Sequence, residues 1–250
     1  MPQSIQIIKY VAPLSIGQIH SKLSKKKFPI KYPDQNRSEK EIELQQEVDH
    51  LQKNTFGIQG TLKYYYQKEN EFADDGTFDV THEMFSFLFD PSSNLVIFHG
   101  SPSFRVRVMR FFSQVLHDGD DLFESITIPK ERLYDLMTKI LEINSHKNNL
   151  DTAQFFHYDK PLGNLRKLGF STIMDYCGTN HQLFKIHYKN CTHWNCSIRI
   201  YKCNGILDKN SDTGYLLRLN KDGTASFTLD RDLTQWNRFV VETMKPILKF

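Results

Sequence analysis

The sequence predicts an α+β fold in which an antiparallel sheet with helices on one face is followed by an antiparallel meander and a C-terminal helix. Three observations predict this class. Several segments rich in aromatic and β-branched residues are bounded by turn residues, as in antiparallel strands. Two segments that begin at Pro102 and Pro129 have apolar residues at helical spacing. Asp222-Gly223 separates two short strand-like segments, which is a strong hairpin signal.

The N-terminal segment is expected to form a strand at residues 4–11 and a short helix at residues 15–24. Ser38 and Glu41 have the spacing of a capping box, which predicts a charged helix over residues 39–52. The apolar stripe of this helix is narrow and consists of Leu44, Val48 and Leu51. We therefore expect the helix to be exposed or to pack by one edge.

Two long strands are predicted at residues 56–67 and 77–90, because both segments are rich in Phe, Tyr, Val and Thr. The turn Pro91-Ser92-Ser93 leads into a third strand at residues 95–99. This turn predicts that the second and third strands form a hairpin.

Three consecutive tyrosines lie in the first long strand. Alternation along a strand places Tyr64 and Tyr66 on one face and Tyr65 on the other. We expect a sheet with one face under helices and the tyrosines at its rim. If the face with Tyr64 and Tyr66 is open instead, it would resemble the stacking platforms of proteins that bind single strands.

A helix is predicted after the third strand, with Ser101 as its N-cap and Pro102 in its first turn. Arg107 and Arg110 share its polar face. A strand is the alternative, because apolar and basic residues alternate over residues 104–108. The apolar face of the helix is formed by Phe104, Val108, Phe111, Phe112, Val115 and Leu116.

A further strand is predicted at residues 120–128 and another at residues 150–158, with a helix that starts at Pro129 between them. The order of elements over residues 56–158 is then β-β-β-α-β-α-β, which is an α+β pattern. The buried face of the second helix is expected to consist of Leu133, Leu136, Met137, Ile140 and Leu141.

Two regions are predicted, an α+β region at residues 1–160 and a meander with a closing helix at residues 161–250. One continuous domain is the alternative. The closing helix is expected to begin near Leu233. The strands of the meander are expected at residues 183–189, 197–203, 215–219 and 225–229.

The composition limits the function classes. The chain has 250 residues, of which 39% are hydrophobic, and a net charge of +3. This small positive excess permits contact with nucleic acid or an acidic protein without requiring it. No apolar run approaches the ~18 residues of a membrane-spanning helix, and the N-terminus lacks the features of a signal peptide. Four cysteines are too few for a disulfide scaffold, so we expect reduced thiols and a cytoplasmic location.

All four cysteines lie between residues 177 and 203, with three histidines among them. Sulfur and imidazole ligands this close together suggest a zinc site. Neither ligand pair has the CxxC spacing of a zinc knuckle, so we expect ordinary packing and no cofactor, with zinc as the alternative. A catalytic Cys191 in a loop, with His193 as its base, is a further alternative. The four candidate ligands are Cys177, His181, Cys191 and Cys196.

Two basic patches are candidates for phosphate contacts. One is the run Lys25, Lys26 and Lys27, which has aromatic residues beside it. The other is the pair Arg107 and Arg110, because arginine can bind phosphate through two hydrogen bonds. Solvated surface charge is the alternative interpretation of both patches.

These features lead to two functional hypotheses. The first is a non-catalytic binding module that contacts nucleic acid or an acidic protein partner through its basic patches, within a larger assembly. The second is a metal-dependent enzyme acting on a nucleotide or nucleic acid, with the metal held by Asp118–Asp121 or by the cysteine cluster. The chain has no GxSxG, GxGxxG or P-loop motif, so the sequence leaves the enzyme question open.

Overall fold

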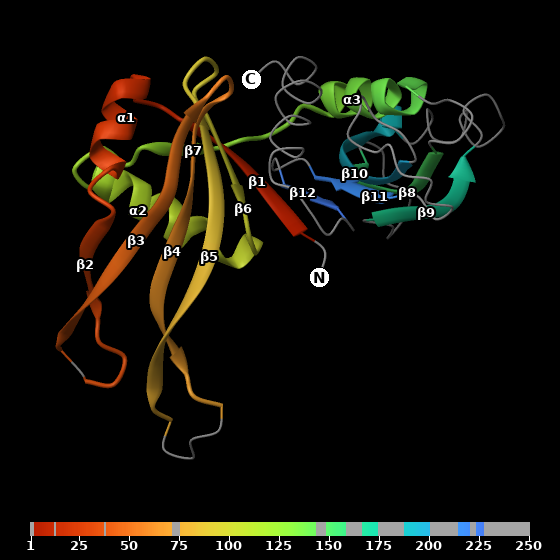
Figure 1. Cartoon of the computed structure of the whole chain (residues 1–250). Coiled ribbons are helices and arrows are strands. Elements are labelled where there is room, and N and C mark those ends of the chain that lie inside the picture. Colours follow the sequence, from red (N-terminus) through yellow and green to blue (C-terminus); the bar gives the residue numbers. More distant parts are fainter. Residues whose placement is uncertain are drawn as a thin grey trace. The chain divides into compact units, whose positions relative to one another are not determined.

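The structure is a computed structural model that describes residues 3–12, 14–37, 39–71, 76–143, 149–158, 167–174, 188–200, 215–220 and 224–227. The protein has a mixed α and β fold that is dominated by antiparallel strands, with few helices (Figure 1). Its contacts divide the chain into a first unit, Lys9–Glu124, and a second unit, Met1–Ile8 with Ser125–Phe250. The boundary expected near residue 160 falls outside the described residues and stays a prediction.

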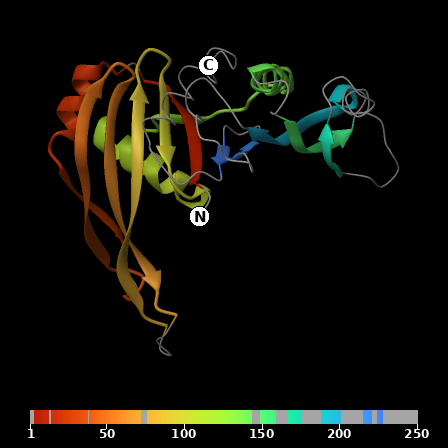
Figure 2. The same ribbon diagram turned by 45° about the vertical axis from the view of Figure 1, so that its right-hand side comes forward.

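The first unit is an antiparallel meander with two helices. Strand β1 (Gln3–Tyr10) ends in this unit and β7 (Phe123–Ser125) begins in it. Strands β2 to β6 each pair antiparallel with the next, and α1 and α2 lie against one face of this sheet (Figures 1 and 2). Its other elements are α1 (Ile16–Leu23), β2 (Lys27–Pro33), β3 (Glu41–Asn54), β4 (Gly57–Glu69), β5 (Phe78–Asp90), β6 (Leu95–His99), the 3-10 turn η1 (Pro102–Phe104) and α2 (Arg105–Leu116).

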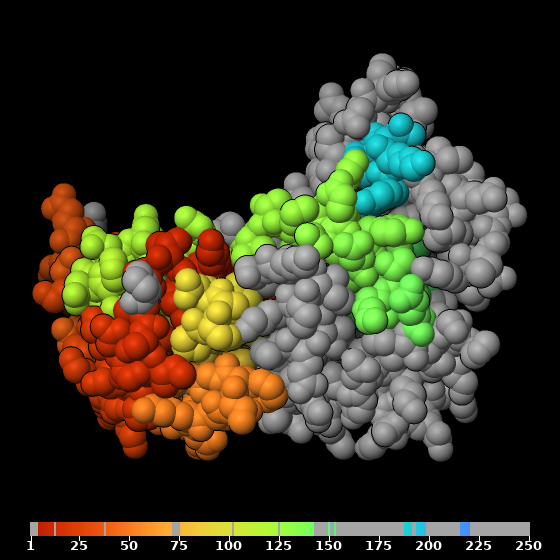
Figure 3. Space-filling model, turned by 90° about the horizontal axis from the view of Figure 1, so that it is seen from above, coloured from red at the N-terminus to blue at the C-terminus, as the bar shows by residue number. Residues whose placement is uncertain are grey.

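The helix predicted over residues 39–52 is wrong, because this segment is strand β3. Its buried side chains, Leu44, Gln46 and Val48, have a period of two rather than the helical period. Pairing with β2 on one side and β4 on the other outweighs the helix propensity of the Glu, Gln and Lys residues. Figure 3 shows α1 beside the turns that join β3 to β4 and β5 to β6 at one end of the sheet.

The predicted helix after β6 is confirmed, although its α-helical part begins at Arg105, after η1. Aromatic side chains of α2 pack on the sheet. The ring of Phe112 lies 5.1 Å from that of Phe87 and 5.0 Å from that of Phe89. The ring of Phe111 lies 5.6 Å from that of Phe28 on β2. This packing buries the apolar face of α2 and leaves Arg107 and Arg110 exposed on its polar face.

The second unit is also built on antiparallel strands, and β8 pairs with both β9 and β10. The predicted hairpin at Asp222-Gly223 is supported, because β11 pairs antiparallel with β12, which pairs with β1. The predicted C-terminal helix lies outside the described residues. The elements are α3 (Lys130–Ile143), β8 (Asn149–Tyr158), β9 (Lys167–Met174), β10 (Cys191–Ile200), β11 (Tyr215–Leu219) and β12 (Thr224–Phe227).

Helix α3 of the second unit has the predicted buried face. It packs on β10, where the indole nitrogen of Trp194 donates to the carbonyl of Lys130 at 3.3 Å. The Lys130 ammonium donates to the carbonyl of Cys191 at 2.8 Å, which attaches the start of the helix to the start of the strand. The strand predicted at residues 120–128 is limited to Phe123–Ser125.

Tyr10 is expected to make the first unit less stable at alkaline pH. Its side chain is fully buried against Phe89, and its hydroxyl has no hydrogen-bond partner among the described residues. Burial, and then the charge of Asp90, raise the pKa of Tyr10 to about 12. The folded state therefore keeps the proton that the unfolded chain releases near pH 10, so this contribution to stability is present below pH 10 and is lost between pH 10 and 12.

The variant Tyr10→Phe tests this expectation. Removal of an unpartnered buried hydroxyl should raise the free energy of unfolding at pH 7 by about 1 kcal/mol. The variant should also lose less stability than the wild type between pH 9 and 11. Urea unfolding at the three pH values measures both effects, and equal losses in the two proteins would contradict the assignment.

Candidate functional site

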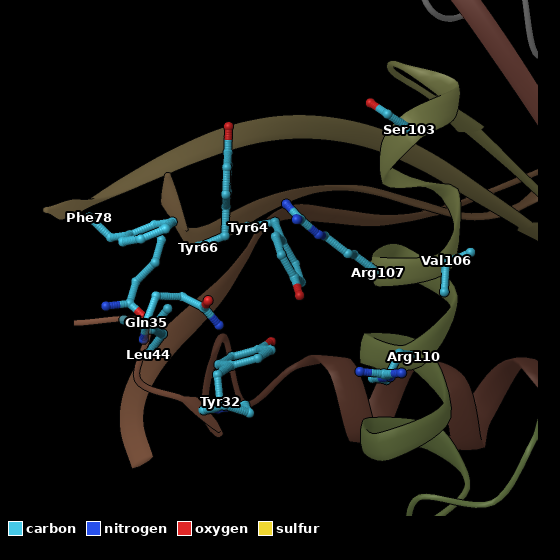
Figure 4. Close-up of a pocket in the computed structure, with 12 residues that line it drawn as sticks. Tyr32, Gln35, Leu44, Tyr64, Tyr66, Phe78, Ser103, Val106, Arg107 and Arg110 are labelled. Atoms are coloured by element: carbon cyan, nitrogen blue, oxygen red, sulfur yellow. The ribbon is translucent and has the colours of Figure 1, made fainter. Parts of the chain in front are cut away.

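A groove of about 500 Å³ lies in the first unit between α2 and the sheet (Figure 4). We call it the tyrosine–arginine groove. Its lining includes two arginines and four aromatic side chains but no carboxylate. The lining residues are Tyr32, Pro33, Gln35, Leu44, Tyr64, Tyr66, Gln67, Phe78, Ser103, Val106, Arg107 and Arg110.

The groove begins where the sheet divides. The pairing of β3 with β4 extends from Asn54↔Gly57 only as far as Glu47↔Lys63. Beyond this point the side chain of Gln46 takes the place of the strand ladder. Its amide nitrogen donates to the carbonyl of Tyr65 at 3.0 Å, and its amide oxygen accepts from the N–H of Tyr65 at 2.6 Å. Gln46 is fully buried, so these bonds satisfy backbone groups that lack a strand partner.

Side-chain amides also join the β2–β3 hairpin to the β4–β5 hairpin at the far end of the groove. Asn36, in the turn between β2 and β3, donates to the carbonyl of Phe78 at 2.8 Å and accepts from its N–H at 2.7 Å. Gln67 on β4 donates to the carboxylate of Asp34 at 3.0 Å and accepts from the N–H of Gln35 at 2.9 Å. The hydrogen bond from Gln67 is the main reason that the pKa of Asp34 lies below its usual value.

The two arginines project from α2 toward the tyrosines of the sheet (Figure 4). The guanidinium of Arg107 lies 5.0 Å from the ring centre of Tyr66 and 5.1 Å from that of Phe104, within the range of a cation–π contact. Both arginine residues are exposed. Among the described residues, neither Arg107 nor Arg110 forms an ion pair with a carboxylate.

The side chains of Tyr32 and Tyr64 meet beside Gln46 at the groove. The amide nitrogen of Gln46 donates to the hydroxyl of Tyr32 at 3.4 Å. The ring of Tyr32 lies 6.3 Å from that of Tyr64 in an edge-to-face arrangement. Burial is the main cause that raises the pKa of both tyrosines, while Arg110 opposes the shift at each of them. Both hydroxyls are therefore neutral at physiological pH, and a neutral hydroxyl such as that of Tyr64 in the groove lining can donate a hydrogen bond.

The structure brings only some of the predicted site residues together. Arg107 and Arg110 line the groove with Tyr64 and Tyr66, while Tyr65 lies on the other side of the sheet beside His82. Gln46, Gln67 and Asn36 were missed, because no local pattern marks a glutamine or asparagine that replaces a strand partner.

The run Lys25–Lys27 lies outside the groove lining, after α1, and ends at the first residue of β2. Lys25 and Lys26 are exposed, and the Lys27 ammonium lies 4.0 Å from the carboxylate of Glu47. Four residues of β2 lie between Lys27 and Tyr32, which places their Cα atoms about 16 Å apart. The two predicted basic patches are therefore separate surfaces.

The predicted metal ligands Cys191 and Cys196 are buried free cysteines on β10. Five residues of strand place them about 16 Å apart with side chains on opposite faces, so the structure does not bring these two sulfurs together. Cys177 and His181 lie outside the described residues, and zinc binding stays a prediction. In the described part of the chain, no group of three or more His, Cys, Asp or Glu side chains is placed to hold a metal ion.

The structure also gives the positions of two other candidate sites, the catalytic Cys191 and the aspartate cluster Asp118–Asp121. Cys191 is the first residue of β10 rather than part of a loop, and its thiol donates to the carbonyl of Tyr188 at 3.4 Å. Burial raises the pKa of the Cys196 thiol, which disfavours the reactive thiolate. Asp118, Asp120 and Asp121 lie in an exposed turn after α2.

No helix in the described part of the chain has the length and apolar character needed to cross a bilayer. The chain matches no known protein-family model, and no curated protein is significantly similar to it.

Proposed function

We propose that this chain is a non-catalytic module that binds single-stranded nucleic acid in the tyrosine–arginine groove, as part of a larger assembly. One observation carries the proposal: Arg107 and Arg110 are exposed, have no carboxylate partner among the described residues, and face tyrosine rings across a groove without acidic side chains. A cytoplasmic location, expected from the reduced cysteines, belongs to the same proposal.

The groove combines the two kinds of contact that single strands use. Arginine donates two parallel hydrogen bonds to phosphate oxygens, and bonds of this charge-assisted kind contribute about 1.5–3 kcal/mol each. Aromatic rings stack on bases and contribute about 1–3 kcal/mol per base. Tyr66 and Phe78 supply such rings, and the hydroxyl of Tyr64 supplies a further neutral donor. The volume of about 500 Å³ lies in the range of small-ligand sites.

An acidic protein partner would use the same arginines. Its carboxylates would leave the aromatic rings of the groove without a matching planar group, which is why nucleic acid is the better match for the whole lining. Binding of an acidic peptide in place of an oligonucleotide would favour this other partner.

The double variant Arg107→Ala/Arg110→Ala tests the proposal. We expect it to bind a 12-nucleotide single strand about 100-fold more weakly than the wild type, since it loses two phosphate contacts of at least about 1.5 kcal/mol each. The slope of log affinity against log salt should become less negative by about 1.4, because two fewer phosphate charges are neutralised. Fluorescence anisotropy at several salt concentrations measures both quantities.

The matched control is Lys25→Ala/Lys26→Ala, which also removes two positive charges but lies outside the groove. We expect this variant to lose less than threefold in affinity at physiological salt, where the screening length is about 8 Å. Equal losses in the two double variants would mean that binding depends on overall charge and not on the groove. Absence of binding to any strand at low salt would overturn the proposed function.

A further inference from the structure

We infer that the tyrosine–arginine groove binds the end of a strand, as a single nucleotide with a terminal phosphate, rather than an internal stretch. This inference rests on the proposed function and names the ligand class of the same site. It depends on two observations: the contacts that close the groove, and the number and spacing of its cations.

Hydrogen bonds close the slit between the two hairpins. At the inner end, the side chain of Gln46 makes two hydrogen bonds with the backbone of Tyr65. At the outer end, Asn36 makes two with the backbone of Phe78, at 2.8 and 2.7 Å. A strand that passed between the hairpins would have to break at least one of these pairs, which would leave backbone groups unsatisfied.

Aromatic contacts flank the groove at two points, just before α2 and in the middle of the helix. At the start of the helix the ring of Phe104 lies 5.0 Å from that of Tyr66. Farther along the helix the ring of Phe111 lies 5.6 Å from that of Phe28 on β2. These contacts attach α2 to the sheet on each side of Arg107 and Arg110. Arg107 and Arg110 between these contacts are exposed, so the groove is open to solvent there and we infer that a ligand enters and leaves on that side.

The cations match one terminal phosphate better than a run of internal phosphates. Arg107 and Arg110 are three residues apart on one helix face, where the Cβ atoms are about 5–6 Å apart. Both guanidinium groups can therefore reach oxygens of a single phosphate. A phosphate monoester carries a charge of about −1.5 to −2 at pH 7, whereas an internal diester carries one negative charge. The two arginines thus balance the charge of a strand end.

The test compares forms of one 12-nucleotide single strand by fluorescence anisotropy: the 5′-phosphate, the 3′-phosphate, the form with hydroxyl groups at both ends, and the circular form. We expect one phosphate-ended strand to bind at least tenfold more tightly than the strand with hydroxyl ends. The circular strand is expected to show no saturable binding at the same concentrations. The variant Arg107→Ala should bind phosphate-ended and hydroxyl-ended strands about equally. The control is Gln114→Ala, at an exposed position of the same helix outside the groove lining, and it should keep the wild-type preference for the phosphate end.

The outcomes separate this inference from the proposed function. Equal binding of the circular and phosphate-ended strands, with loss in Arg107→Ala/Arg110→Ala, would overturn the inference and leave the proposed function in place. Absence of binding to every form would overturn both. A nucleoside monophosphate that competes as strongly as the oligonucleotide would support the terminal-phosphate site and would contradict a nucleic-acid function.

Discussion

Replacement of Phe112 by alanine is expected to lower the free energy of unfolding of the first unit by about 3–5 kcal/mol. Phe112 is fully buried, and its ring lies within 5.2 Å of the rings of Phe87, Phe89 and Phe111. The substitution removes these edge-to-face contacts and leaves a cavity between α2 and β5. Because Arg107 and Arg110 are on the same helix, the loss should also weaken binding in the groove.

Urea unfolding followed by far-UV circular dichroism measures the loss. Hydrogen exchange in peptides from β4 and α2 assigns it to the first unit, with peptides from β10 as the internal reference. Phe112→Leu is the matched control, because it keeps a large apolar side chain and should cost about 1–2 kcal/mol. A loss below about 1 kcal/mol in Phe112→Ala would show that the ring is not central to this core.

Replacement of Gln46 by leucine is expected to cost about 3 kcal/mol and to disturb the groove. Leucine fills the space but leaves the N–H and carbonyl of Tyr65 without their partners, at about 1–3 kcal/mol for each unpaired group. The substitution also removes the donor to the hydroxyl of Tyr32, whose ring packs edge-to-face against that of Tyr64. If one base-stacking ring is displaced as a result, oligonucleotide binding should weaken by about tenfold.

The matched control is Gln45→Leu, at an exposed neighbouring position of β3. It should change stability by less than about 0.5 kcal/mol. Urea unfolding and anisotropy together distinguish the two roles of Gln46. Wild-type stability in Gln46→Leu would mean that the Tyr65 backbone finds other partners, and unchanged binding at reduced stability would mean that the groove does not depend on Gln46.

Helix α2 shows what local patterns can predict. Pro102 near its start and the apolar residues at helical spacing predict both the helix and the face that carries Arg107 and Arg110. Strand β3 shows where such patterns fail. Leu44 and Val48 are four residues apart, a spacing that satisfies a period of two as well as a helical turn, so the capping-box spacing led to the wrong choice.

The groove required information that no local pattern contains. Tyr32, Tyr64 and Arg110 come from three elements far apart in the chain. Alternation along β4 predicts that Tyr64 and Tyr66 share a face, but not that α2 brings arginines to that face. The cysteine cluster shows the opposite case: Cys191 and Cys196 are close in sequence, and an extended strand separates them.

The sequence by itself determined strands β4, β5 and β6, the faces of α2 and α3, and the alternation of the tyrosines, because each depends on the periodicity of neighbouring residues. Only the tertiary structure decided that β3 separates from β4 beyond Glu47 and that Gln46 replaces the missing ladder. It also decided that the basic face of α2, and not the lysine run, meets the tyrosines. The physical reason is that a buried backbone group must find a hydrogen-bond partner, and which residue supplies it depends on how distant segments pack.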